Sequence, residues 1–279
     1  MGEIIIDFSE PPIQGLMDYV FENYCKLDEL CEIQGTRVSV EECVECCGGS
    51  YYGGDSEYQC ANFKKVYLIK YLAVQVAQIE SLIEKYILHD IENKVNLSVV
   101  SLGGGPGTEI IALMNELNIC AGNYNVSFDN VDREASWKPI YEDLASRFAK
   151  QMKNVKLKTS FITCDAASYN SDKRYDIVFV SWILSQVDER DRRKILKIAG
   201  SLTAEEGHII VTDRLEPLLI TNLSTLIKEI EGLTILEHDK LTDHCGVTFP
   251  EEIKETFEVR ILLRTAFWVL QRSSNEFFN

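Results

Sequence analysis

The stretch VVSLGGGPGTEIIALM, from Val99 to Met114, decides the fold of this chain. It begins with an apolar run typical of a buried parallel strand, and this run ends in four glycines and a proline. A second apolar run at helical spacing follows. Glycine permits positive φ angles and lets a ligand approach the backbone closely. The stretch therefore predicts a strand, a ligand-binding turn and a helix.

Short apolar strands alternate with helices after this turn. The expected strands are 97–102, 125–131, 155–164, 175–180, 208–212, 234–237 and 266–271, and the expected helices are 108–116, 137–150, 188–201 and 219–230. This alternation predicts an α/β fold with a doubly wound, mostly parallel seven-stranded sheet. A proline-containing segment without a clear crossover helix precedes the last strand, which favours an antiparallel last strand at one edge.

The N-terminal part of the chain has a different pattern. Residues 12–32 and 61–87 are spaced as helices, and a loop rich in Cys, Gly and Tyr lies between them. We therefore expect a helical extension over residues 1–95 and a ligand-binding domain over 96–279. In a doubly wound sheet, ligands bind at the carboxyl ends of the strands, where the glycine turn is placed.

Three kinds of glycine turn compete at this position. A phosphate-binding P-loop needs a Lys, and the chain has Gly107-Thr108-Glu109 instead. In a dinucleotide fingerprint, Thr108 would replace the third glycine and Glu109 would put a carboxylate where the pyrophosphate binds. The third pattern is G-x-G-x-G with an acid just downstream. It resembles the first motif of class I S-adenosylmethionine-dependent methyltransferases. A purely structural turn is the remaining alternative.

The resemblance extends to the ends of the later strands, and it covers roughly residues 97–272. It implies S-adenosylmethionine as the cofactor and S-adenosylhomocysteine as the product. Asp132 would bind the ribose, with Asp129 as its rival, and Asp165 the adenine. The implied cofactor-binding residues are Gly103, Gly104, Gly105, Gly107, Asp132, Asp165, Ala166, Ser181 and Trp182.

The methyl acceptor is less well indicated, because the D/N-P-P-Y/F motif of many amino-methylating nucleic-acid enzymes is replaced by SWIL. The candidates for catalytic residues are Tyr51, Tyr52, Tyr67, Trp182 and Asp213. The tyrosines near the Gly53-Gly54 pair could cradle a cationic or ring-containing small molecule. The same loop is equally consistent with a simple cap of the long helix that follows.

Charge and composition favour a small-molecule acceptor. The formal net charge is -16, which disfavours a nucleic-acid partner, although residues 152–158 and 188–197 are locally basic. The first function hypothesis is therefore a methyltransferase that acts on a small-molecule acceptor held under the N-terminal extension. The alternatives are a ribosomal or transfer RNA methyltransferase and a non-catalytic methyltransferase-like scaffold. The sequence does not indicate the oligomeric state.

The cysteines indicate where the chain resides. There are nine of them, an odd number, and six precede residue 61. Without a secretory signal, this pattern predicts reduced thiols and a cytoplasmic or nuclear location. Only Cys43 and Cys46 have the spacing of a zinc knuckle, so we expect no metal and retain these two as weak candidates. No apolar run is long enough to predict a membrane span.

Overall fold

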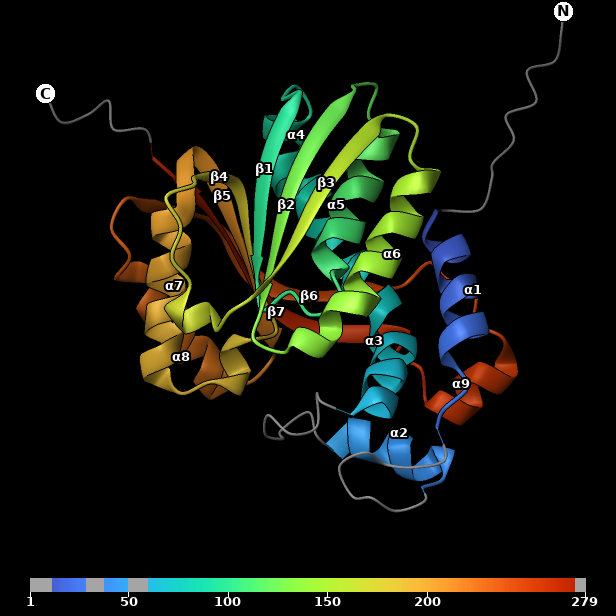
Figure 1. Cartoon of the computed structure of the whole chain (residues 1–279). Helices are drawn as coiled ribbons and strands as arrows, with labels where there is room; N and C mark the ends of the chain where they lie inside the picture. The colour runs from blue at the N-terminus through green and yellow to red at the C-terminus, as the bar shows by residue number, and fades with distance from the viewer. Residues whose placement is uncertain (1–11, 29–37, 50–59, 274–279) are drawn as a thin grey trace, which may run out of the picture.

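The computed structural model describes residues 12–28, 38–49 and 60–273. A seven-stranded sheet with the order β3-β2-β1-β4-β5-β7-β6 forms its centre (Figure 1). The strands are β1 (Asn96–Leu102), β2 (Tyr124–Asp132), β3 (Val155–Thr163), β4 (Tyr175–Ser181), β5 (Thr203–Arg214), β6 (Leu233–His244) and β7 (Leu262–Arg272). Strands β1 to β5 pair in parallel, and β7 is antiparallel to both β5 and β6. The predicted doubly wound sheet with an antiparallel last strand is confirmed.

Helices cover both faces of the sheet. They are α1 (Pro12–Tyr24), α2 (Val40–Gly49), α3 (Ala61–Leu82), α4 (Leu88–Ile91), α5 (Thr108–Ile119), α6 (Lys138–Gln151), α7 (Glu189–Leu202), α8 (Pro217–Lys228) and α9 (Glu251–Phe257). Helices α1, α3, α5 and α6 share one buried cluster with Val99 and Phe128 of the sheet. Helices α7 and α8 share the other cluster with Val100 and Val178. Neighbouring strand residues thus alternate between two cores, as the period of a strand requires.

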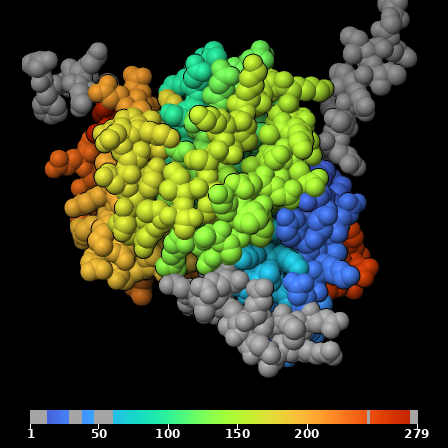
Figure 2. All heavy atoms as spheres, viewed as in Figure 1, coloured from blue at the N-terminus to red at the C-terminus, as the bar shows by residue number. Residues whose placement is uncertain are grey.

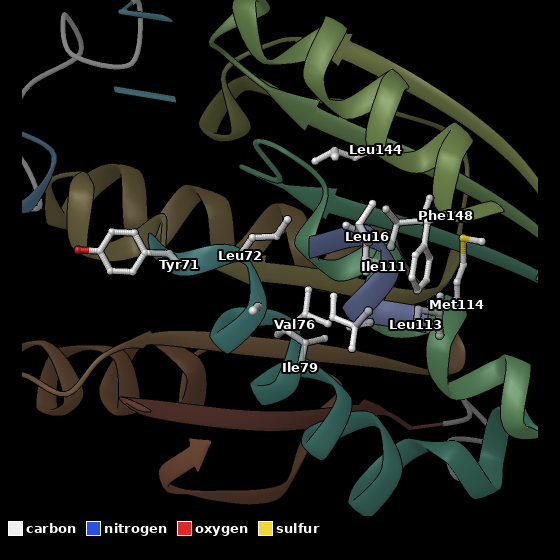
Figure 3. Packing of buried hydrophobic residues seen from close by; sticks show 14 of the residues in the cluster. Leu16, Tyr71, Leu72, Val76, Ile79, Ile111, Leu113, Met114, Leu144 and Phe148 are labelled. Carbon is white, nitrogen blue, oxygen red and sulfur yellow. The ribbon is translucent and has the colours of Figure 1, made fainter. Parts of the chain in front are cut away.

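Helix α3 lies at the centre of the larger core. Its side chains Leu72, Val76 and Ile79 pack near Ile111 of α5 and Leu16 of α1 (Figure 3). The helical stretch Ala61–Ile91 is long and apolar enough to cross a membrane, but 78% of its most apolar window is buried inside the protein. Its hydrophobicity is therefore that of a core helix.

Helix α1 also makes specific contacts with the segment between β6 and α9. Gln14 of α1 donates to the Thr248 carbonyl (3.1 Å) and accepts from the Thr248 amide (2.7 Å). The rings of Phe21 and Phe249 lie 5.4 Å apart. In Figure 2 the surface of α1 is continuous with that of α6. A division of the chain at residues 95/96 stays a prediction.

The structure corrects four expected elements. Helix α1 ends at Tyr24, and residues 25–28 are not helical. Helix α2 occupies part of the expected Cys-rich loop, helix α9 lies between β6 and β7, and a π-helical turn, Ile83–Ile87, separates α3 from α4. Ser39 and Glu42 start α2 through a reciprocal capping box: the Ser39 amide donates to Glu42 (2.7 Å), and the Glu42 amide donates to Ser39 Oγ (3.2 Å). That S-x-x-E signal is readable in the sequence.

Candidate active site

A cavity of about 270 Å³ opens at the carboxyl ends of the parallel strands. Eight of the nine predicted cofactor-binding residues line it, and Gly107 is the exception. Its lining residues are Tyr67, Gln75, Gly103, Gly104, Gly105, Pro106, Thr108, Glu109, Asp132, Arg133, Glu134, Trp137, Asp165, Ala166, Ser181, Trp182, Ile183, Gln186 and Val187. Residues from Gly103 to Trp182 meet here because the parallel strands end at one edge of the sheet.

The glycine turn is held against the end of β2. The amides of Gly103 and Gly104 donate to the carbonyl of Val131 at 2.7 and 3.2 Å. Gly104 cannot carry a side chain, because a Cβ there would lie 1.8 Å from Asn130 Oδ1. Gly107 has φ +90° and starts α5, and a Cβ there would clash with Tyr141 at 2.6 Å. Gly107 is therefore needed for packing and does not face the cavity.

Gly105 is the glycine whose missing side chain leaves space in the cavity. It has φ +43°, and a Cβ would meet only Trp137 at 3.8 Å and Asp132 at 3.9 Å. Its amide donates to Asp132 Oδ2 (2.9 Å), and its carbonyl accepts from Asn130 (3.0 Å). A ligand could therefore approach this backbone directly, as the sequence pattern predicts.

Asp132 is the acid at the end of β2 that reaches the cavity. Its Oδ2 accepts from Gly105, and its Oδ1 accepts from the amide of Glu134 (2.8 Å). Burial raises its pKa, although these two hydrogen bonds oppose the shift. The remaining lone pairs of a carboxylate held in this way are suited to accept from vicinal hydroxyls.

Asp129 has a different role. It is buried within the sheet and accepts hydrogen bonds from Ser160, from Lys173 (2.7 Å) and from the Tyr175 hydroxyl (2.8 Å). Burial by itself would raise its pKa, but these three donors outweigh burial and lower it. The structure therefore places Asp132 at the cavity and Asp129 in a closed polar network.

Asp165 and Ala166 follow β3 at the cavity wall. Asp165 Oδ1 accepts from the Ala167 amide (2.7 Å) and so caps the short 3-10 helix Ala166–Ser168. This cap fixes the carboxylate at the rim of the cavity. The geometry is compatible with the adenine contact that the resemblance implies.

Ser181 and Trp182 end β4, where the backbone is strained. Trp182 has φ +52°, an unusual value for a bulky residue, and its amide donates to Thr212 (2.8 Å). Gln186 donates to the Trp182 carbonyl (2.9 Å) and secures the turn. Both Ser181 and Trp182 line the cavity, as predicted. Strain of this kind at a cavity is a feature of functional sites.

Asp213, a candidate for a catalytic residue, is fully buried and lies behind the cavity rather than in its wall. Its Oδ2 accepts from the amide of Ser185 (2.9 Å), and its Oδ1 accepts from that of Arg214 (2.7 Å). Burial raises its pKa. Asp213 therefore holds the turn after β4 in place, and a direct contact with substrate is not supported.

Two residues that line the cavity, Gln75 and Trp137, are not among the candidates from the sequence, whereas a third, Tyr67, is. The Tyr67 hydroxyl and the Gln75 amide are hydrogen-bonded at 3.0 Å, and the ring centroids of Tyr67 and Trp137 lie 5.6 Å apart. Helix α3 of the N-terminal part thus supplies one wall of the site. The other two tyrosine candidates, Tyr51 and Tyr52, lie outside the described residues.

Glu109 is the least expected residue of the site. It is the second residue of α5, only 2% exposed, and it lines the cavity. Burial raises its pKa to about 7, although the hydroxyls of Ser181 and Ser101 lie close enough to oppose this. An acid of this kind is half ionised near neutral pH and responds strongly to a charged neighbour.

The weak metal candidates do not form a metal centre among the described residues, where no group of three His, Cys, Asp or Glu side chains could hold an ion. Cys43 is buried, and its sulfur accepts from Asn62 (3.6 Å), whereas Cys46 is exposed.

Comparisons with known proteins agree with this architecture. No family model and no curated protein matches the sequence. Magnesium protoporphyrin IX methyltransferase from Synechocystis PCC 6803, solved with bound S-adenosylmethionine, is similar in structure: the TM-score is 0.50 at 14% identity, over 85% of this chain and 98% of that one. The structure of the same enzyme with bound S-adenosylhomocysteine has a TM-score of 0.50 at 15% identity, over 83% of this chain and 100% of that one.

A class I S-adenosylmethionine-dependent methyltransferase structure from Listeria monocytogenes also has a TM-score of 0.50, at 14% identity over 88% of this chain and 72% of that one. The sheet order, the strand directions and these similarities together define the class: the chain has the class I S-adenosylmethionine-dependent methyltransferase fold over most of its length.

Proposed function

We propose that this protein is an S-adenosylmethionine-dependent methyltransferase and that the cavity at the carboxyl ends of the strands binds the cofactor. One observation carries the proposal: eight residues that the sequence pattern assigns to the cofactor, spread from Gly103 to Trp182, line a single cavity. A structural turn without a ligand would not require the acids after β2 and β3 to meet at the same place.

The cavity has the chemistry that this cofactor needs. Gly105 offers close backbone approach, Asp132 offers acceptors for ribose hydroxyls, and Asp165 offers an acceptor for an amino group. The end of β4 would face the sulfonium methyl. Methyl transfer from a sulfonium is mainly a matter of in-line positioning, which a turn fixed by Asp213 and Gln186 supports.

We further propose a small-molecule acceptor. Tyr67 and Trp137 add aromatic surface to the cavity, which suits a ring-containing or cationic molecule. The basic residues Lys156 and Lys158 lie in a separate hollow near the amino ends of the strands. Lys158 is seven residues before Asp165, or roughly 23 Å along an extended chain.

The second basic segment, on α7, also gives little support to an RNA substrate. Arg193 and Lys194 are paired with acids, at 3.7 Å between Arg193 and Glu189 and at 2.8 Å between Lys194 and Asp191. An RNA-binding surface needs cations that are free to neutralise phosphates. The small-molecule hypothesis is therefore preferred.

Calorimetric titration with S-adenosylmethionine tests the proposal. We expect micromolar affinity for the wild-type protein, at least a 100-fold loss in Gly105→Arg because the new side chain fills the cavity, and at least a tenfold loss in Asp132→Ala. Gly232→Arg is the matched control, since Gly232 also has a positive φ (+74°) but has open space around it.

Normal affinity in both cavity variants would refute the assignment of the site. An equal loss of affinity in Gly232→Arg would show that backbone strain, and not a filled cavity, causes the loss in Gly105→Arg. Methyl transfer to total RNA but not to a panel of small amines, phenols and carboxylic acids would overturn the proposed acceptor class.

A further inference from the structure

One face of helix α3 is polar and aromatic, although the helix lies in the core. Lys64, Tyr67, Tyr71, Gln75 and Gln78 follow one another at intervals of three or four residues, so they lie along one stripe of the helix. All of them except Tyr67 are at most 6% exposed. Buried polar groups cost free energy unless they are hydrogen-bonded, so this stripe requires a physical reason.

Both ends of the stripe are attached to the sheet near the carboxyl ends of its parallel strands. At one end, Lys64 donates to the Ser136 hydroxyl in the turn after β2. At the other end, Gln78 donates to a carbonyl of β7 (2.8 Å) and accepts from the Thr265 hydroxyl (2.7 Å). Thr265 pairs with Arg214, the last residue of β5. The middle of the stripe therefore crosses the strands between β2 and β5, where the cavity opens.

Gln75 and Gln78 are two buried amides on this stripe with different surroundings. Gln78 is hydrogen-bonded to β7 through both its nitrogen and its oxygen. Gln75 lines the cavity, and within the described part of the chain its side chain pairs with the Tyr67 hydroxyl alone, at 3.0 Å from Nε2 and 3.1 Å from Oε1. Because Tyr67 belongs to the same helix, this pair does not attach α3 to the sheet.

The Gln75 amide retains hydrogen-bonding capacity toward the cavity. A glutamine side chain has two N–H donors and an oxygen with two lone pairs, so a donor and an acceptor position remain beside the Tyr67 hydroxyl. The residues assigned to the cofactor, namely the glycine turn, Asp132 and Asp165, all stand at strand ends, whereas Tyr67 and Gln75 come from α3. The wall formed by α3 is therefore available to the second substrate.

The lining of the cavity indicates the chemistry of that second molecule. The ring centroids of Tyr67 and Trp137 lie 5.6 Å apart, so aromatic surface adjoins the Gln75 amide. The carboxyl groups among the described lining residues are those of Glu109, Asp132, Glu134 and Asp165. They outnumber the guanidinium of Arg133 in the same lining, which disfavours an anionic acceptor. An aromatic ring with a hydroxyl or amino group complements both the rings and the amide.

We infer that Gln75, held by Tyr67, selects the methyl acceptor, and that this acceptor is a small aromatic molecule with a hydroxyl or amino group. In the transfer, a lone pair of that oxygen or nitrogen forms the bond to the methyl carbon while the carbon–sulfur bond breaks. The electron pair of the broken bond stays on sulfur, which becomes a neutral thioether, and the proton of the acceptor leaves to solvent. This inference rests on the proposed function.

Methyl transfer from radiolabelled S-adenosylmethionine tests the acceptor class. The aromatic probes are phenol, naphthol and aniline, and their ring-saturated counterparts are cyclohexanol, decahydronaphthol and cyclohexylamine. Each pair carries the same reactive group, so a difference within a pair reports the contribution of the ring. We expect transfer to at least one aromatic probe, at a rate at least about tenfold above that of its saturated counterpart.

Gln75→Met tests the selecting residue, because it removes the amide and keeps a side chain of similar length. We expect it to raise KM for the aromatic probe by about 3- to 10-fold, with a smaller change in kcat. Tyr67→Phe removes the hydroxyl that holds the amide and should raise KM less. Calorimetry should give an affinity for S-adenosylhomocysteine within about twofold of wild type in both variants, since neither residue is assigned to the cofactor.

Gln78→Met is the matched control. It removes a buried amide from the same stripe, but one that is bonded to β7 and does not line the cavity. It should lower the melting temperature and leave KM for the probe unchanged. Thr265→Val is a milder control, since it removes only the hydroxyl that donates to Gln78.

The possible results separate this inference from the proposed function. Unchanged KM in Gln75→Met overturns the inference, as does an equal rise of KM in the control variants or a loss of S-adenosylhomocysteine affinity in Gln75→Met. Transfer to none of the aromatic probes, or equal transfer to their saturated counterparts, overturns the acceptor class. If the wild-type protein binds neither S-adenosylmethionine nor S-adenosylhomocysteine, the proposed function itself fails.

Discussion

Two buried acids, Asp129 of β2 and Glu109 of α5, show how the hydrogen-bond donors around a buried carboxylate set the direction of its pKa shift. Asp129 is 4% exposed and receives hydrogen bonds from Ser160, Lys173 and Tyr175. Glu109 is 2% exposed, and its Oε2 has no partner among the described residues. Hydrogen bonds from its three donors lower the pKa of Asp129, whereas burial raises that of Glu109.

The comparison indicates that burial alone does not identify a functional acid. In Asp129 the fold supplies the donors, so the charge stabilises the network. At Glu109 the fold supplies burial without enough donors, so ionisation of this carboxyl costs free energy.

The largest effect expected from this comparison is a gain of stability in Glu109→Gln without ligand. The pKa of Glu109 is raised from 4.5 to about 7, so the free energy of unfolding that this group contributes is present below pH 4.5 and is lost as pH rises through 7. The variant should be more stable than wild type by about 3 kcal/mol at pH 8 and nearly equal at pH 4.5. Urea unfolding at both pH values measures this, and a difference that does not change with pH contradicts it.

A smaller effect of opposite sign is expected for Asp129→Asn. The pKa of Asp129 is lowered, so its contribution is present above its usual pKa of 3.8 and is lost as pH falls through the lower folded value. The variant should lose about 1–3 kcal/mol at pH 7, because charge-assisted hydrogen bonds are removed. Affinity for S-adenosylhomocysteine should not change. A large loss of affinity with normal stability would show that Asp129 is a binding residue, which would contradict its description as a purely structural acid.

The smallest effects concern two serines that flank these acids. Ser160→Ala removes a hydroxyl that donates to Asp129 and should cost about 1 kcal/mol. Ser101→Ala removes a hydroxyl that has no hydrogen-bond partner among the described residues, and it should change the stability of the ligand-free protein by less than about 0.5 kcal/mol. Thermal unfolding of both variants under one condition tests the difference, and equal costs would show that Ser101 is already satisfied without ligand.

Residues at the ends of strands were predictable from the sequence. Asp132, Asp165 and Trp182 each stand at or just beyond the end of a parallel strand, and the carboxyl ends of parallel strands meet at one edge. Asp213 also lies near a strand end but does not line the cavity, because the position at a strand end does not reveal whether a side chain points into the cavity or behind it.

Residues contributed by helices could not be placed in the same way. Helix α3 is buried on nearly all sides, so its periodicity does not show which side chains reach the site, and Gln75 was missed. Trp137 depends on the path of the chain after β2. Glu109 was recognised as an acid near the turn, but its burial follows from how α5 packs on β1 and β4, which no local pattern determines.

A crystal structure of the protein with S-adenosylhomocysteine tests the account most directly. We predict the ligand in the cavity along the glycine turn, with its ribose hydroxyls within hydrogen-bond distance of Asp132. A saturated crystal with the ligand bound outside the cavity would contradict the assignment of the site.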